Sequence, residues 1–203
     1  MPSGKSPFDS IRILNERAIV AEVLQAEPVV RFCAVISHTE SLRKQAIEQI
    51  EHQWGEVVCK TDPLPFEAGG YYTPSMGADL RKELVAFGHP LDGGTLADWK
   101  RWTNEHEVEL SAGMDDVERP INLDPGYITQ AKLVLATTKD RDHRVYLRDG
   151  IYGEITLTYT AKRWIGHRWT YPDYQTKAVF DFATECRNYL RKHLQSTAGF
   201  RSR

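Results

Sequence analysis

The stretch DPGYITQAKLVLATTKDRDHRVYLRDGIYGEITLTYT, from Asp124 to Thr160, decides the fold. Its first three residues, Asp-Pro-Gly, are typical of a turn, or of a capped helix that begins with proline. We therefore predict a helical turn over 124–131. The apolar, β-branched run that follows predicts a strand over 132–138.

Two further strands are predicted in the second half of this stretch, over 143–148 and 151–160. Apolar and polar residues alternate in both, as expected where one face of a strand is buried. The Arg148-Asp149-Gly150 sequence between them is a turn signal. With the strand that precedes them, they predict an antiparallel β-meander.

Strand and helix patterns alternate through the rest of the chain. Residues 29–36 predict a central strand, and residues 40–54 carry apolar side chains at helical spacing, with Gly55 as the C-terminal stop. Further strands are predicted over 56–60 and 80–87, with a long loop between them. The remaining predicted helices cover 10–26, 95–110 and 175–194.

This order of elements predicts the α+β class: a mostly antiparallel sheet with a β-α-β start, a C-terminal β-meander and helices packed on one face. A length of 203 residues suits one domain. We predict an N-terminal extension with a peripheral helix (1–27), a single globular domain (28–195) and a flexible tail (196–203).

Charge and composition narrow the classes of function. Lys and Arg number 26 against 28 Asp and Glu, a net charge of −2, so the chain lacks the broad basic field of a non-specific nucleic-acid binder. Three separated cysteines suggest reduced thiols. Because the sequence has neither an apolar run of membrane-spanning length nor a signal-peptide pattern, we expect a cytoplasmic protein.

The familiar motifs of catalysis and cofactor binding do not occur. There is no P-loop, no dinucleotide-binding glycine motif and no nucleophile elbow. The seven histidines have no zinc-binding spacing. We therefore predict no metal site and leave the cofactor open.

The candidate site is the polar face of the predicted meander. Side chains two apart on a strand share a face. If the apolar side chains of 145–147 and 155–157 are buried, the opposite face and its rim carry the polar residues: Lys139, His143, Arg144, Tyr146, Glu154 and Thr156.

Two kinds of chemistry meet on this face. His143 and Glu154 are candidate catalytic residues, because imidazole and carboxylate groups exchange protons. Lys139 and Arg144 suit a phosphate or carboxylate group. Alternatively, the face is simply solvated, and its Arg–Glu pairs stabilise strand pairing.

Asp124, Tyr146 and Tyr171 complete the candidate ligand-binding residues. Tyr171 belongs to WTYPDY (169–174), whose rings would stack on a flat ligand or anchor the loop to the core. Asp124 would contact the ligand or only cap the turn. Capping explains this residue more simply than metal binding does.

From residue 119 onward, RPINLDPGYITQAKLVLATTKDRDHRVYLRDGIYGEITLTY followed by WTYPDY resembles an uncharacterised bacterial family, the domain-of-unknown-function family 4416. The resemblance extends to VVRFCAVIS, to the PLPFE and YYTPSMG parts of the long loop and to DWKRWTNEHE, so it covers roughly residues 28–190. Gly153 stands where alanine is expected. The resemblance carries no activity, cofactor or catalytic residue over to this chain.

The residues favour a cytoplasmic protein that binds a small anionic ligand, phosphate- or nucleotide-like, and leave open whether it is an enzyme. The alternative is a non-enzymatic module that docks RNA or a protein on its aromatic-rich sheet and loops. Net charge does not favour nucleic acid. No membrane association is expected.

Overall fold

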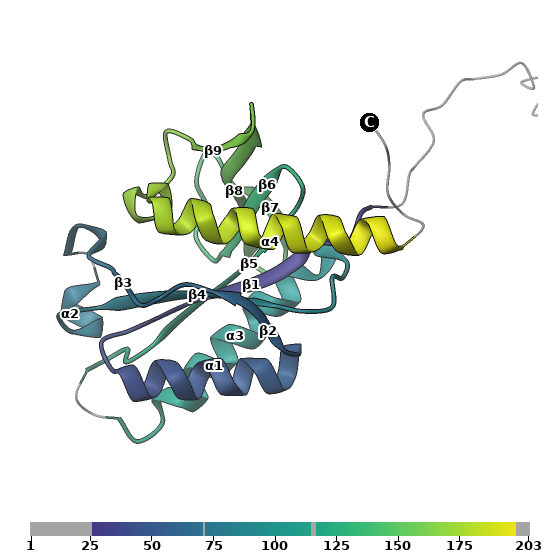
Figure 1. The fold of residues 1–203 in the computed structure, drawn as a ribbon. Helices are drawn as coiled ribbons and strands as arrows, with labels where there is room; N and C mark the ends of the chain where they lie inside the picture. The colour runs from purple at the N-terminus through teal and green to yellow at the C-terminus, as the bar shows by residue number, and fades with distance from the viewer. Residues whose placement is uncertain (1–25, 71, 115–116, 198–203) are drawn as a thin grey trace, which may run out of the picture.

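The computed structural model describes residues 26–70, 72–114 and 117–197. The predicted peripheral helix over 10–26 lies almost entirely outside these residues, as does most of the predicted tail. Figure 1 shows the described elements in chain order. They are β1 (Val30–Ser37), α1 (Glu40–Trp54), β2 (Val57–Lys60), β3 (Leu64–Pro65), α2 (Thr73–Met76), β4 (Arg81–Phe87), α3 (Leu96–Ser111), β5 (Asn122–Ile128), β6 (Lys132–Thr137), β7 (Val145–Arg148), β8 (Ile151–Thr160), β9 (Arg163–Gly166) and α4 (Lys177–Ser196).

One antiparallel sheet organises the molecule, with the strand order β2-β4-β1-β5-β6-β8-β7 and with β3 paired to β4 and β9 to β8. The α+β class and the antiparallel sheet are therefore confirmed. The strand predicted over 29–36 is β1, and it lies centrally, as expected. In the β-α-β start, β2 pairs with β4 and not with β1.

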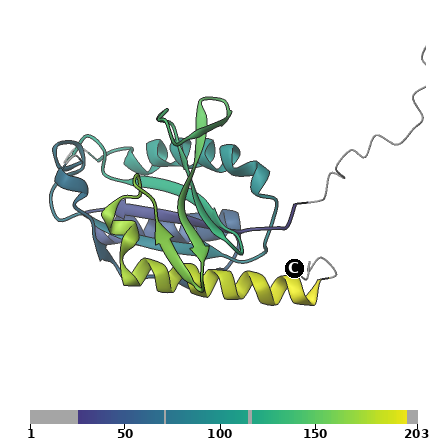
Figure 2. The same ribbon diagram turned by 90° about the horizontal axis from the view of Figure 1, so that it is seen from above.

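Helices cover both faces of the sheet, so the prediction that they pack on one face is wrong (Figures 1 and 2). Cys33 and Val35 of β1 pack in the cluster that contains α1 and α3. Phe32 and Ala34 pack in the cluster that contains α4. A central strand that is apolar on both faces needs cover on both, and β1 has this pattern.

Strands β5 and β6 form a fork. They pair only from Ile128–Leu133 to Gly126–Leu135. Beyond that point β5 continues beside β1 as far as Asn122, whereas β6 continues beside β8 as far as Thr137. The two strands therefore separate at one end of the sheet and leave the inner edge of β5 without a strand partner.

The Asp-Pro-Gly sequence lies inside β5, so the helical turn predicted over 124–131 is wrong. Leu123 directs its backbone N–H and C=O toward α3, away from β1. Backbone groups two residues apart on a strand point to the same edge, so the missing N–H of Pro125 also faces away from β1, where a proline is tolerated. Gly126 is needed for close approach, because a Cβ there would lie 2.4 Å from the Val134 carbonyl oxygen.

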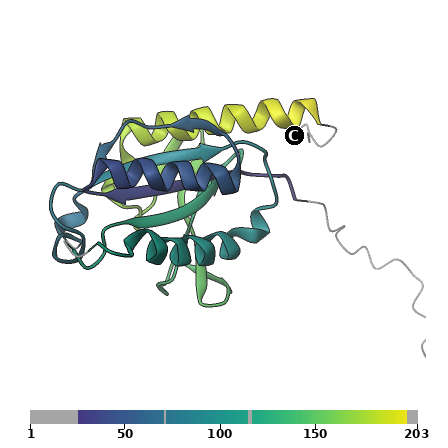
Figure 3. The same cartoon turned by 90° about the horizontal axis from the view of Figure 1, so that it is seen from below.

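The predicted strands at 143–148 and 151–160 form the hairpin β7–β8, which extends past α3 (Figures 2 and 3). The predicted meander of these three strands is wrong, because β8 lies between β6 and β7 and pairs with both. Both β7 and β9, a strand that was not predicted, pair along one edge of β8. Between them Trp169 and Thr170 donate side-chain hydrogen bonds to the carbonyl oxygens of Ile155 and Thr156.

A bulge in β8 changes the predicted alternation of its side chains. Leu133 and Val134 of β6 face Leu157 and Ile155 respectively, so β8 has one extra residue at this point. As a result Ile155 is 41% exposed, whereas Leu157 is fully buried. The expectation that these two apolar side chains are buried on one face is therefore wrong.

Candidate functional site

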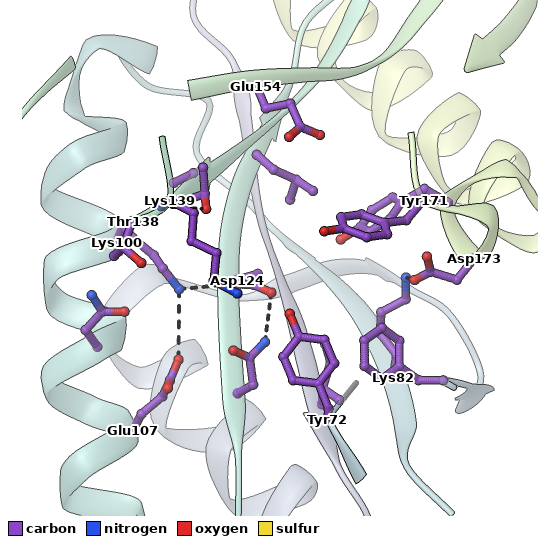
Figure 4. A pocket seen from close by; sticks show the side chains of 18 of the residues that line it. Tyr72, Lys82, Lys100, Glu107, Asp124, Thr138, Lys139, Glu154, Tyr171 and Asp173 are labelled. Atoms are coloured by element: carbon purple, nitrogen blue, oxygen red, sulfur yellow. Dashed lines mark hydrogen bonds and ion pairs between the residues drawn. The ribbon is translucent and has the colours of Figure 1, made fainter. Parts of the chain in front are cut away.

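A pocket of about 350 Å³ lies at the end of the sheet where β5 and β6 separate (Figure 4). Its floor belongs to the face that α4 covers, because Ala34, Leu84 and Leu133, two residues further along their strands, pack in the α4 cluster. The segment before α4 forms one wall. The floor and this wall consist of Ile36, Lys82, Asn122, Asp124, Leu135, Thr137, Glu154, Tyr171, Asp173 and Tyr174.

Two charged side chains of α3 reach the pocket through the fork. Lys100 Nζ donates to the carbonyl oxygen of Leu123 at 2.8 Å, and Glu107 Oε1 accepts from the Leu123 N–H at 2.8 Å. These contacts replace the hydrogen bonds that a neighbouring strand would make. Lys100 Nζ also donates to Asp124 Oδ1 at 3.0 Å, so the same side chain supports the sheet and the pocket.

The Asp124 carboxylate is part of a closed network. Asn122 Nδ2 donates to Asp124 Oδ2 at 2.8 Å, and Arg119 donates to both Asn122 and Glu107. Burial opposes ionisation of Asp124, but Lys100, Asn122 and Arg119 outweigh it and lower the pKa of this carboxyl. Burial raises the pKa of Glu107 against the opposing effect of Lys100 and Arg119. Lys100 and Arg119 thus lower the pKa of both carboxyls, but burial prevails at Glu107 and not at Asp124.

A second ion pair lies across the pocket, where Lys82 of β4 meets Asp173 (Figure 4). The Lys82 ammonium lies 3.7 Å from the centre of the Tyr174 ring, a cation–π distance. Burial lowers the pKa of Lys82, and Asp173 opposes this shift. Burial also raises the pKa of Tyr174 well above its usual value.

Glu154 anchors a third group of charges, and its carboxylate points into the pocket (Figure 4). Arg144 Nε donates to Glu154 Oε2 at 2.8 Å, and His143 Nε2 lies 3.1 Å from the same oxygen. Thr156 Oγ1 donates to Glu154 Oε1 at 3.3 Å. Arg144 Nη1 donates to the carbonyl oxygen of Lys139, which fixes the loop after β6.

Most of the residues predicted from sequence converge on this pocket. Asp124, Lys139, Arg144, Glu154 and Tyr171 line it. The structure thus brings the Arg144 guanidinium and the Glu154 carboxylate to the same side of the sheet, and their side chains are buried and not on a solvated face. Their roles in binding or catalysis stay predictions.

Two predicted residues lie outside the lining. His143 contacts Glu154 without lining the pocket itself. Tyr146 is 58% exposed and packs edge-on against Tyr152 at a ring distance of 5.4 Å. The expected polar face does not include Tyr146, because β7 lies at the edge of the sheet and is exposed on both of its faces. Asp124 does not cap a helix, since it lies within β5.

Several polar residues of the pocket, most of them charged, were not predicted from the sequence. In α3 a usable signal exists, because Lys100 and Glu107 follow Leu96 and Thr103 by four residues and share their buried stripe. In β4, Lys82 alternates with the buried Leu84 and Ala86. Charged residues at such buried positions indicate a polar site more directly than exposed charges do. The missed residues are Lys82, Lys100, Glu107, Arg119, Asn122 and Asp173.

The chain matches the model of the domain of unknown function DUF4416 over residues 27–189. It belongs to this family. The match confirms the resemblance seen in the sequence, and the DUF4416 region includes every residue of the pocket. No curated protein and no solved structure matches the chain.

The described part of this DUF4416 chain can be assessed for metal-binding side chains and for membrane-spanning helices. Within residues 26–70, 72–114 and 117–197, no group of three or more His, Cys, Asp or Glu side chains could hold a metal ion. In the same residues no helix combines the length and the apolar character needed to cross a membrane.

Proposed function

We propose that the pocket binds a small organic anion with a phosphate-like or carboxylate group. The observation that supports this most is a local reversal of charge: five cationic side chains and four carboxylates line the pocket, whereas the whole chain carries a net charge of −2. A cleft with this excess attracts anions. The cations are Lys82, Lys100, Arg119, Lys139 and Arg144.

Lys139 and Arg144 are the cations that would hold the anionic group. Both line the pocket, and Figure 4 shows the Lys139 side chain extending into it toward Asp124. The Arg144 guanidinium is held by Glu154 and by the Lys139 carbonyl oxygen. A cation that is already held in place loses little conformational entropy when it binds an anion.

Aromatic side chains on the walls suit a flat organic part of the ligand. Tyr72 and Tyr171 both line the pocket (Figure 4). Tyr171 is 52% exposed, so much of its ring is accessible. With a volume at the lower end of the range for ligand pockets, the site suits a ligand about the size of a mononucleotide or smaller.

The test is a thermal-shift and calorimetric screen with sulfate, pyrophosphate, nucleoside monophosphates and small carboxylic acids. A ligand that binds only the folded state raises the melting temperature. We expect Lys139→Ala to weaken binding by about tenfold or more, since hydrogen bonds to charged groups are strong. The matched control is Lys132→Ala, because Lys132 is exposed at the other end of β6. Absence of any bound anion, or equal losses in both variants, would reject the proposal.

A docking module for a protein or for RNA is the second candidate. It is favoured by three consecutive exposed side chains on β7: Val145 is 69% exposed, Tyr146 58% and Leu147 41%. Exposed apolar patches often mark interaction sites. RNA binding here would weaken steeply with salt, so equal affinity for a single-stranded RNA at low and physiological salt would exclude RNA and leave apolar docking.

A further inference from the structure

We propose that His143 and Glu154 share one proton and exchange it with the ligand in the pocket. The site would then perform acid–base chemistry on the anion that it binds. This inference rests on the proposed function, because the proton needs a ligand to accept or supply it. Three side chains form a row of contacts: Glu154 in the pocket, His143 behind it and Asp142 at the surface.

The pocket end of the row is a buried carboxylate. Glu154 is 4% exposed, and Figure 4 shows its carboxylate directed into the pocket. Oxygen Oε2 contacts Arg144 and His143, whereas Oε1 accepts only the hydrogen bond from Thr156 among the described contacts. A carboxylate oxygen accepts more than one hydrogen bond, so Oε1 is available to a ligand.

The middle of the row is an imidazole between two acceptors. His143 Nε2 lies 3.1 Å from Glu154 Oε2, and Nδ1 lies 2.9 Å from Asp142 Oδ1. Hydrogen bonds from Arg168 and His143 lower the pKa of Asp142 to about 2, so this carboxyl is ionised near neutral pH. It can therefore only accept, and the proton on Nδ1 belongs to that contact.

The second contact needs a proton of its own. With Nδ1 donating to Asp142, the Nε2 contact to Glu154 is a hydrogen bond only if a proton lies between these two atoms. Arg144 donates to the same Glu154 oxygen, which favours the ionised carboxylate and places the proton on Nε2. The pair thus holds one proton more than a neutral imidazole beside a carboxylate would hold.

The surroundings keep the imidazole in this orientation. Its ring stacks on Trp169 at a centroid distance of 5.0 Å and an angle of 10°, and His167 stacks at 4.8 Å on Trp169. Trp169 is itself held by its hydrogen bond to the Ile155 carbonyl oxygen. The titratable and charged groups around His143 come from the loop before β7, from β8 and from the loop after β9. They are Asp142, Arg144, Glu154, His167 and Arg168.

The proton transfer balances without a redox partner. In the donating direction the N–H bond at Nε2 breaks and an O–H bond forms at Glu154 Oε2. The carboxyl group then gives a proton to a ligand atom that supplies its lone pair. His143 is then neutral with its other proton still on Nδ1 beside Asp142, and Nε2 regains a proton through Glu154 from the ligand or from water in the pocket. In the reverse direction Glu154 removes a proton from the ligand. Glu154 is then the catalytic residue, and His143 and Asp142 are positioning residues.

Nuclear magnetic resonance of ¹⁵N-histidine-labelled protein tests the shared proton without a ligand. At neutral pH we expect the wild type to show N–H protons on both nitrogens of His143. In Glu154→Gln the side-chain amide can donate to Nε2, so the Nε2 proton signal should disappear while the Nδ1 proton remains. Glu109→Gln is the matched control, because Glu109 contacts the Nδ1 atom of His106 and lies on α3. An unprotonated Nε2 in the wild type would overturn the inference.

Calorimetric titration with sulfate tests the coupling to the ligand, since sulfate has no titration near neutral pH. Titrations in two buffers of different ionisation enthalpy report the protons taken up on binding. We expect uptake in the wild type and little or none in Glu154→Gln, with sulfate bound by both. Equal uptake in the two proteins would overturn the shared proton and leave anion binding intact. Absence of sulfate binding in both would count against the proposed function instead.

Discussion

The Lys100 ammonium donates to the Leu123 carbonyl oxygen on the edge of β5 that β6 leaves open. One helix side chain therefore does two things: it satisfies a buried backbone group, and it holds Asp124 in the pocket. The hydrogen bonding of the β5 edge and the charge balance of the pocket therefore both depend on Lys100.

Replacing Lys100 by methionine should destabilise the protein strongly. The change leaves the Leu123 carbonyl and the Asp124 carboxylate without the Lys100 ammonium, and breaking a buried ion pair typically costs about 3–5 kcal/mol. Urea unfolding followed by circular dichroism measures this loss. The control is Lys44→Met on the exposed surface of α1, where the Glu40 pair is solvated and the melting temperature should hardly change. Equal effects in the two variants would contradict the role of Lys100.

Asp124→Asn should flatten the acid limb of the stability profile. The pKa of Asp124 is lower in the folded protein because Lys100 and Asn122 outweigh burial. Such a carboxyl contributes stability above its unfolded value of about 3.9 and loses it as the pH falls through the folded value. The measurement is the free energy of unfolding between about pH 2 and pH 6.

Glu107→Gln should change the same profile in the opposite sense. The pKa of Glu107 is raised by burial, so its ionisation costs stability as the pH rises from the unfolded value of about 4.3 to the folded value. Removing this group should make the profile steeper with rising pH. Asp124→Asn and Glu107→Gln curves that shift together would show that the two carboxyls are not held as described.

Two glycines of the sheet should differ sharply in their tolerance of alanine. At Gly126 a Cβ would lie 2.4 Å from the Val134 carbonyl oxygen and 2.7 Å from the Phe32 ring, whereas at Gly153 the nearest atom is a Leu147 methyl at 3.7 Å. We expect Gly126→Ala to cost about 1–3 kcal/mol or more and Gly153→Ala to be neutral or slightly stabilising. Thermal unfolding measures the stability of both variants. Similar losses of stability in the two would refute the close approach of β5 and β6.

Arg144→Ala should lower both anion affinity and the melting temperature. Its side chain is 8% exposed and donates to the buried Glu154 carboxylate, so its removal leaves that carboxylate with only the contacts to His143 and Thr156 among the described hydrogen bonds. The exposed Arg141 is the control, and Arg141→Ala should leave the melting temperature nearly unchanged. If both variants melt alike, Arg144 lies on a solvated surface after all.

The sequence predicts regular elements well where the pattern and the local chemistry agree. The strand at 29–36, the helix that ends at Gly55 and the hairpin turn at 148–150 are confirmed. The strand β5 was missed because Asp-Pro-Gly normally indicates a turn. Its proline is tolerated only because the fork removes a strand partner, which is a tertiary effect.

Part of the candidate site was predictable because local pairing of neighbouring strands brings its residues together. Lys139, Arg144 and Glu154 lie close together in sequence on either side of a hairpin, so local pairing brings them together. Lys82 and Lys100 come from distant elements, and only the folded arrangement places them in the same pocket. The prediction that Tyr146 belongs to the site is not supported by its position, because alternation along an edge strand does not determine which face is covered.

The fork in the sheet sets a trade-off for anyone who engineers this protein. Leucine at both 100 and 107 would remove the two side chains that bond the backbone of Leu123 on the open edge of β5. This edge would then be free to pair with β6 along its full length. Such a redesign would exchange the pocket for a continuous sheet, and no space for a ligand would remain between the strands.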